Sequence, residues 1–116
     1  MADDPDEPIT IRLDAGIWSG IDGGMDNAGQ DAIDLDDQPT QLVAQEIREA
    51  GWAQVPWVDG AWPPMDQIIA ITLTRAQWRF ALNDALDSQP IYESLGDGQS
   101  VQLCEAAIRM ITEALG

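Results

Sequence analysis

The chain has 116 residues, of which 45% are hydrophobic, and its 21 Asp and Glu against 5 Lys and Arg give a formal net charge of -16. This length predicts one domain, and the apolar fraction is sufficient for a hydrophobic core. The chain has no His, a single Cys and only arginine as cation, so the sequence excludes histidine acid/base catalysis, lysine Schiff bases, zinc sites of His or Cys and an internal disulfide. Its negative charge disfavours direct binding of nucleic acid, which is itself negatively charged.

Residues 1–8 form an acidic segment that carries Asp3, Asp4, Asp6 and Glu7. A signal peptide is basic and then apolar, and a membrane span needs at least about 18 apolar residues, so we expect neither. We therefore expect a cytoplasmic protein, in which this flexible N-terminal extension precedes a single domain over residues 9–116.

The first half of the domain begins with a short β-branched run, 9–13, that predicts a strand. Four glycines follow within about ten residues, and each costs a helix about 1 kcal/mol relative to alanine. We therefore expect only a short helix over 14–21 before an irregular loop. A second helix is predicted to begin at Pro39 or Thr40 and to end at Gly51, which is a typical left-handed C-terminal residue.

The loop between these two helices, 22–37, is rich in aspartate. Oxygen-rich loops bind calcium, but an EF-hand needs glycine at its sixth position and glutamate at its twelfth. Counting from Asp22 places Asn27 at the sixth position, and counting from Asp34 places Gln45 at the twelfth, so we predict no metal site. We expect a solvated surface whose partner-binding carboxylates are Asp22, Asp26, Asp31, Asp34, Asp36 and Asp37.

A connector, 52–67, follows and contains three of the five tryptophans of the chain. Within it Asp59 and Gly60 favour a two-residue hairpin, because both residues tolerate the positive φ that this turn requires. The tryptophans either cover one side of a small core or form an exposed anchor for a partner, since tryptophan is enriched in binding hot spots. We therefore add Trp57 and Trp62 to the partner-binding candidates.

The second half begins with another β-branched run, 68–73, that predicts a strand. Thr74 and Gln77 then have the spacing of a capping box, which marks the start of a helix. Its apolar residues recur at helical spacing and the helix is predicted to end near Pro90, because proline disfavours helix in the residue before it. Ser100 can cap a last helix with a single apolar face.

The two halves, 9–51 and 68–116, show a weak internal duplication. Ten identities keep their order at an offset of 60 to 61 residues, with a single one-residue gap, and Arg48 matches Arg109. We therefore predict an α+β fold of two pseudo-duplicated strand-helix-helix units packed as one small domain, with a short two- to four-stranded sheet and about four helices. Strands 9–13 and 68–73 would pair around a pseudo-twofold axis.

For catalysis the chain offers carboxylates, arginines, Tyr92 and Cys104. Cys104 falls on the apolar face of the last predicted helix, where a cysteine is ordinarily an inert small hydrophobe. We therefore predict that the protein is not an enzyme and needs no cofactor. Its charge predicts a basic protein or nucleoprotein complex as its partner.

In its size, its acidity and its lack of catalytic groups, the whole chain resembles small phage- or prophage-encoded inhibitors of the anti-CRISPR or anti-restriction type, some of which mimic DNA. The resemblance implies that carboxylates displayed like phosphates occupy the basic channel of a nuclease complex in the cytoplasm of a bacterial host. Two alternatives stay open. One is an immunity protein or antitoxin, and the other is a phage structural or assembly protein that forms a homodimer through its tryptophan-rich segment.

Overall fold

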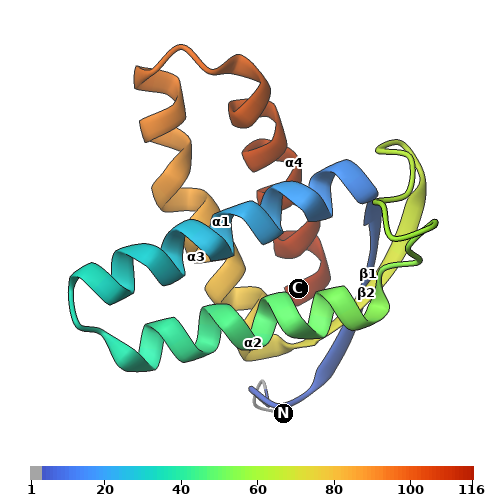
Figure 1. Cartoon of the computed structure of the whole chain (residues 1–116), viewed down its shortest axis with the longest axis horizontal. Coiled ribbons are helices and arrows are strands. Elements are labelled where there is room, and N and C mark those ends of the chain that lie inside the picture. The colour runs from blue at the N-terminus through green and yellow to red at the C-terminus, as the bar shows by residue number, and fades with distance from the viewer. Residues whose placement is uncertain (1–3) are drawn as a thin grey trace.

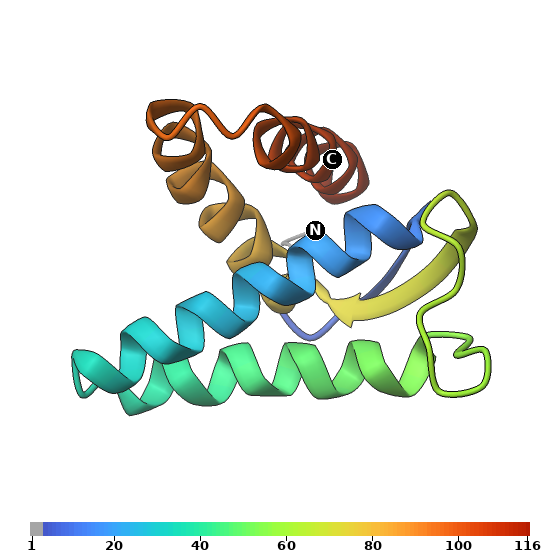
Figure 2. The ribbon, with the colours of Figure 1, turned by 45° about the horizontal axis from the view of Figure 1, so that its top comes forward.

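The computed structural model describes residues 4–116, which form two strands and four helices (Figure 1). The order along the chain is β1 (Pro8–Asp14), α1 (Ala15–Asp34), α2 (Gln38–Gln54), β2 (Ile68–Thr74), α3 (Arg75–Ser94) and α4 (Gly98–Leu115). The two strands form an antiparallel sheet, and α1 lies between α2 and the α3–α4 pair (Figure 2). The predicted α+β fold with two strand-helix-helix units is confirmed.

The duplication is more regular in the structure than in the sequence. Each element of the second half begins 60 residues after its equivalent in the first half, so the predicted one-residue gap is wrong. Arg48 is consequently equivalent to Ile108 and not to Arg109. In the sheet Ile11 pairs with its own equivalent, Ile71, and this pairing places the pseudo-twofold axis through that residue pair.

The core lies between the inner face of the sheet and the first turns of α1 and α3. Two equivalent tryptophans, Trp18 and Trp78, are fully buried there and meet edge to face, with ring centroids 6.1 Å apart. Nε1–H of Trp78 donates a hydrogen bond of 2.8 Å to the carbonyl of Ile9. Nε1 of Trp18 is buried and has no hydrogen-bond partner among residues 4–116, so the two halves differ at this equivalent pair.

The expectation of a short helix over 14–21 and an irregular acidic loop is wrong, because α1 continues to Asp34. Its glycines permit close packing. A Cβ added to Gly16 would lie 3.2 Å from the carbonyl oxygen of Met65, and one added to Gly24 would lie 2.6 Å from Oδ2 of Asp84. Tertiary contacts of this kind outweigh the weak helix propensity of glycine.

Two other predicted helix ends are also wrong. Gly51 lies inside α2, which ends at Gln54, and a Cβ at this position would overlap the buried ring of Trp18. Helix α3 passes through Pro90, which cannot donate the helical bond to the carbonyl of Leu86. Because Leu86 is exposed, water can take the place of that bond.

The helix starts follow the sequence more closely. The predicted capping box of α3 is present, since Thr74 accepts from the amide of Gln77 and the Gln77 side chain accepts from the amide of Thr74. For α4 the cap is Asp97, whose carboxylate accepts from the amide of Ser100, whereas Ser100 itself was predicted as the cap.

The connector forms the expected hairpin. Val58 and Ala61 exchange backbone hydrogen bonds of 2.9 Å, and the two residues between them, Asp59 and Gly60, have φ values of 50° and 79°. The right-hand loops in Figure 1 are this segment.

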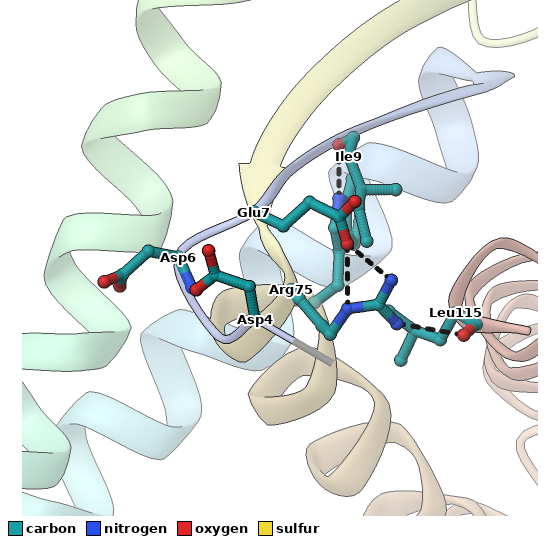
Figure 3. Close-up of polar contacts among 7 residues, drawn as sticks. Asp4, Asp6, Glu7, Ile9, Arg75 and Leu115 are labelled. Carbon is teal, nitrogen blue, oxygen red and sulfur yellow. Dashed lines mark hydrogen bonds and ion pairs between the residues drawn. The ribbon is translucent and has the colours of Figure 1, made fainter. Parts of the chain in front are cut away.

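The acidic N-terminal segment is not a loose extension in the part that the structure describes. Figure 3 shows Glu7 beside Arg75, whose Nη2 lies 2.7 Å from the Glu7 carboxylate and whose Nη1 donates to the carbonyl of Leu115. The carbonyls of Glu7 and Pro5 accept the first free amides of α3. The segment therefore caps that helix, while Asp3 lies outside the described residues. No helix within residues 4–116 has the length and apolar character that a membrane span needs.

Candidate functional site

Two of the six predicted carboxylates share one cationic partner within the chain. Arg48 contacts Asp22 at 3.3 Å through Nε and Asp26 at 3.0 Å through Nη1, and its guanidinium lies 4.7 Å from the ring centroid of Trp52. Asp22 is also buried, with only 8% of its surface exposed. These contacts hold α1 against α2. Asp22 is therefore withdrawn from a partner, whereas the Asp26 side chain is paired with Arg48 but remains 52% exposed.

The other four predicted carboxylates gather where α1 ends and α2 begins. Asp31, Asp34 and Asp36 are exposed, while Asp37 caps α2 by accepting bonds from the amide and hydroxyl of Thr40. These hydrogen bonds lower the pKa of Asp37. We call Asp31, Asp34 and Asp36 the acidic tip.

The predicted tryptophans belong to the connector, which begins at the end of α2 opposite the acidic tip (Figure 1). Helix α2 has 17 residues, so its two ends are about 25 Å apart at 1.5 Å per residue. Trp57 and Trp62 contact each other, with ring centroids 4.8 Å apart. Trp62 packs against the core, whereas Trp57 is 40% exposed and its indole N–H donates to the carbonyl of Trp52. The acidic tip and the tryptophans therefore form two separate surfaces.

A cavity that the sequence did not predict lies between α1, α3 and α4. It has a volume of about 70 Å³. Helix α1 contributes Gly20, Ile21, Gly24 and Met25 to its walls, α3 contributes Ala81, Asp84, Ala85, Ser88 and Tyr92, and α4 contributes Ser100, Leu103, Cys104 and Ala107. We call it the Asp84 pocket.

Divergence between the two halves explains this cavity. In the first half Met25 and Ile47 are large side chains that are almost completely buried. Their equivalents in the second half, 60 residues later, are Ala85 and Ala107, and both line the pocket. Two large side chains have thus been replaced by methyl groups, and this loss of volume leaves space between α3 and α4.

Asp84 is the unusual group in the pocket. Its equivalent is Gly24, and the two positions lie against each other where α1 crosses α3, so the glycine leaves room for the carboxylate. Within residues 4–116 Asp84 receives no hydrogen bond and forms no ion pair. Burial, and then the negative charges of Asp87 and Asp31, raise its pKa to about 6.

The other polar groups of the pocket are neutral at pH 7. Burial and the charge of Asp84 raise the pKa of the Cys104 thiol, and burial followed by Cys104 and Asp84 raises that of Tyr92. A thiol with a raised pKa is a poor nucleophile. The hydroxyls and the thiol can exchange hydrogen bonds with a ligand, but they provide no activated group for covalent catalysis.

Asp84 and Asp87 were missed because no pattern in the sequence separates them from other acids on predicted helices. One signal was present, since Asp84 stands between Ala81 and Ala85 beside the apolar stripe of its helix. The structure places Asp31 of the acidic tip close enough to Asp84 to raise its pKa, so the tip and the pocket are adjacent. Within the described residues no three His, Cys, Asp or Glu side chains are arranged to hold a metal ion.

No protein-family model, curated protein or solved structure matches this chain.

Proposed function

We propose that this protein is a non-enzymatic acidic binding module that inhibits a basic nucleic-acid-binding protein or nuclease complex by occupying its nucleic-acid channel. The observation that carries the proposal is the excess of surface carboxylate. Even if each of the 5 cationic residues neutralised one of the 21 acids, the net charge of -16 would remain. Arg48 and Arg75 already pair with acids of their own chain, so little positive charge is left to balance the rest.

The shape of the acidic surface also supports this function. Asp31 and Asp34 stand on the last turns of a 20-residue helix and Asp36 follows on the turn, so their backbone is fixed before a partner arrives. A rigid array of charges loses less conformational entropy on binding than a disordered acidic tail does. The electric field of the acidic tip attracts a basic channel over several ångströms and repels nucleic acid. An inhibitor that competes with nucleic acid for the same channel needs both properties.

We assign this inhibition to the cytoplasm of a bacterial host, in line with the resemblance to phage-encoded inhibitors. An immunity protein or antitoxin would use the same chemistry against a basic nuclease. Genome context separates the two, because a toxin gene next to this one favours the immunity protein and a phage context favours the inhibitor.

The test begins with capture of partners from a bacterial lysate at low salt and their identification by mass spectrometry. The captured protein is then purified, and its association rate with this chain is measured as a function of salt and of competing DNA. We expect DNA to displace the chain and the association rate to fall by about tenfold or more as salt rises, since charge steering acts on association. Binding that is indifferent to both salt and DNA would contradict the proposal.

Variants locate the surface. Asp31, Asp34 and Asp36 are changed together to asparagine, and a control carries the same change at Asp6, Asp59 and Asp66, three exposed carboxylates away from the acidic tip. The tip variant should associate several-fold more slowly than the control. Equal rates would mean that the tip is not the binding surface.

The second candidate is a self-associating assembly protein, and exposed apolar groups on the connector favour it. Trp52 and Trp57 are each 40% exposed and Val58 is 53% exposed. Light scattering distinguishes the two functions, because a stable dimer that Trp57→Ala dissociates favours assembly, whereas a monomer favours the inhibitor.

A further inference from the structure

We propose that the Asp84 pocket binds the cationic end of a lysine or arginine side chain from the protein partner. This inference rests on the proposed function, and it adds a specific anchor point to a surface that was so far defined only by its charge.

The first reason is the state of the Asp84 carboxylate. It is partly buried, no group within residues 4–116 donates a hydrogen bond to it, and it lies against the backbone of Gly24. A carboxylate in such a place is costly unless a cation or a donor accompanies it. A partner that brings an ammonium or guanidinium group provides both the charge and the donors that are missing.

The second reason is the match between the walls of the pocket and a long basic side chain. Ile21, Met25 and Leu103 are apolar and can cover an alkyl stem, while the hydroxyls of Ser88 and Ser100 can accept further hydrogen bonds from its charged end. The volume of about 70 Å³ is well below the roughly 300–1,000 Å³ of sites for drug-sized ligands. It suits the end of one side chain.

The third reason is the position of the pocket beside the acidic tip. Asp31 and Asp87 lie close enough to Asp84 to raise its pKa, so the three carboxylates form one negative field at the pocket. Charges at the rim attract a basic surface, and a central pocket that takes an arginine or lysine fits the usual arrangement of binding hot spots.

The probe for the test is N-acetyl-lysine N-methylamide, with the neutral N-acetyl-norleucine N-methylamide as its counterpart. Each is titrated into the full chain labelled with 15N, and amide shifts are followed by NMR. We expect the lysine probe to shift amides around Gly24, Asp84 and Cys104, with a Kd in the millimolar range because a single side chain makes few contacts. Equal shifts from the norleucine probe would overturn the inference.

Three variants accompany the titration. Asp84→Asn keeps the shape of the side chain and should weaken lysine binding by about tenfold or more, whereas Asp87→Asn removes the same charge from the rim and should weaken it by only about threefold. The double variant Ala85→Met with Ala107→Ile copies the first half of the chain into the pocket and should abolish binding. A melting curve is recorded for this double variant to test whether it is folded. Unchanged lysine binding in Asp84→Asn would contradict the inference independently of the double variant.

Lysine binding should also weaken as the pH falls from 7 to 5. Burial and neighbouring charges raise the pKa of Asp84 to about 6, so the carboxylate loses its charge over this interval. The titratable groups that face it are Asp31 from α1, Asp87 and Tyr92 from α3 and Cys104 from α4. A pH-independent Kd would show that the cation does not bind at Asp84.

The outcome also separates this inference from the proposed function. If a basic partner is captured and Asp84→Asn binds it as well as the unchanged chain does, the pocket is not the anchor and the function stands. If the lysine probe binds at Asp84 but no basic protein is captured, the cation specificity stands and the proposed function fails. The assignment of the cation to a side chain of a protein partner then fails as well.

Discussion

Two glycines in helix interiors should respond in opposite directions to the same substitution. Gly51 is buried in α2, and a Cβ there would overlap the ring of Trp18, which is itself completely buried and surrounded by core residues. Alanine is favoured over glycine in a helix by about 1 kcal/mol, but overpacking a core costs about 1–3 kcal/mol. Because the overlap is with a ring that cannot move aside, we expect Gly51→Ala to lower the free energy of unfolding by about 1–2 kcal/mol.

Gly23 provides the matched control. It is exposed within α1, and a Cβ added to it would meet no atom within 4 Å. Gly23→Ala should therefore gain the helix propensity without strain and raise the free energy of unfolding by about 0.5–1 kcal/mol. Urea unfolding measures both changes, and each kcal/mol should move the melting temperature by about 4 °C. A Gly51→Ala variant as stable as the unchanged protein would refute the close packing of α2 on Trp18.

The remaining predictions concern Asp84 and the two core tryptophans. The folded state raises the pKa of Asp84 from 3.8 to about 6, so its charge opposes folding at neutral pH and ceases to do so as the pH falls toward 4. Asp84→Asn should therefore be more stable than the unchanged chain at pH 7, by about 1–2 kcal/mol after allowance for screening by water, and the difference should vanish near pH 4 in urea unfolding. Asp87→Asn removes only one of the two charges that act on Asp84, so it should give a smaller gain in stability at pH 7. Trp78→Phe removes a buried hydrogen bond, whereas Trp18→Phe removes an N–H group that has no partner among residues 4–116. Thermal unfolding should therefore show Trp78→Phe to be the more destabilising change, by about 1 kcal/mol or more. Equal losses of stability in the two variants would contradict the difference in hydrogen bonding.

Local signals in the sequence predicted most of the fold. The β-branched runs gave the two strands, the Thr74 and Gln77 pair gave the start of α3, and Asp59 with Gly60 gave the hairpin. Each of these depends on residues next to one another in the chain. The failures at Gly51 and Pro90 have a different origin, because contacts with Trp18 and access to water decide there whether a helix continues.

The candidate site was less predictable than the fold, for a related reason. Composition showed that the chain is strongly acidic, but it could not show that Arg48 would bind Asp22 and Asp26, which are more than 20 residues away. It also could not show a cavity, because a cavity depends on the sizes of side chains from three helices. Charge is a property of the whole sequence, whereas the pairing and exposure of each carboxylate are properties of the fold.

The pseudo-twofold axis explains why the two halves must differ near the Asp84 pocket. Equivalent residues meet on the axis, and identical side chains suit it only where they pack against each other, as Ile11 does with Ile71. Where position 24 meets position 84, two aspartates would place like charges in contact, whereas glycine opposite aspartate leaves one carboxylate with room. A half-buried carboxylate and the adjacent cavity each lower stability, and a bound cation, as proposed above, would compensate for the cost of both.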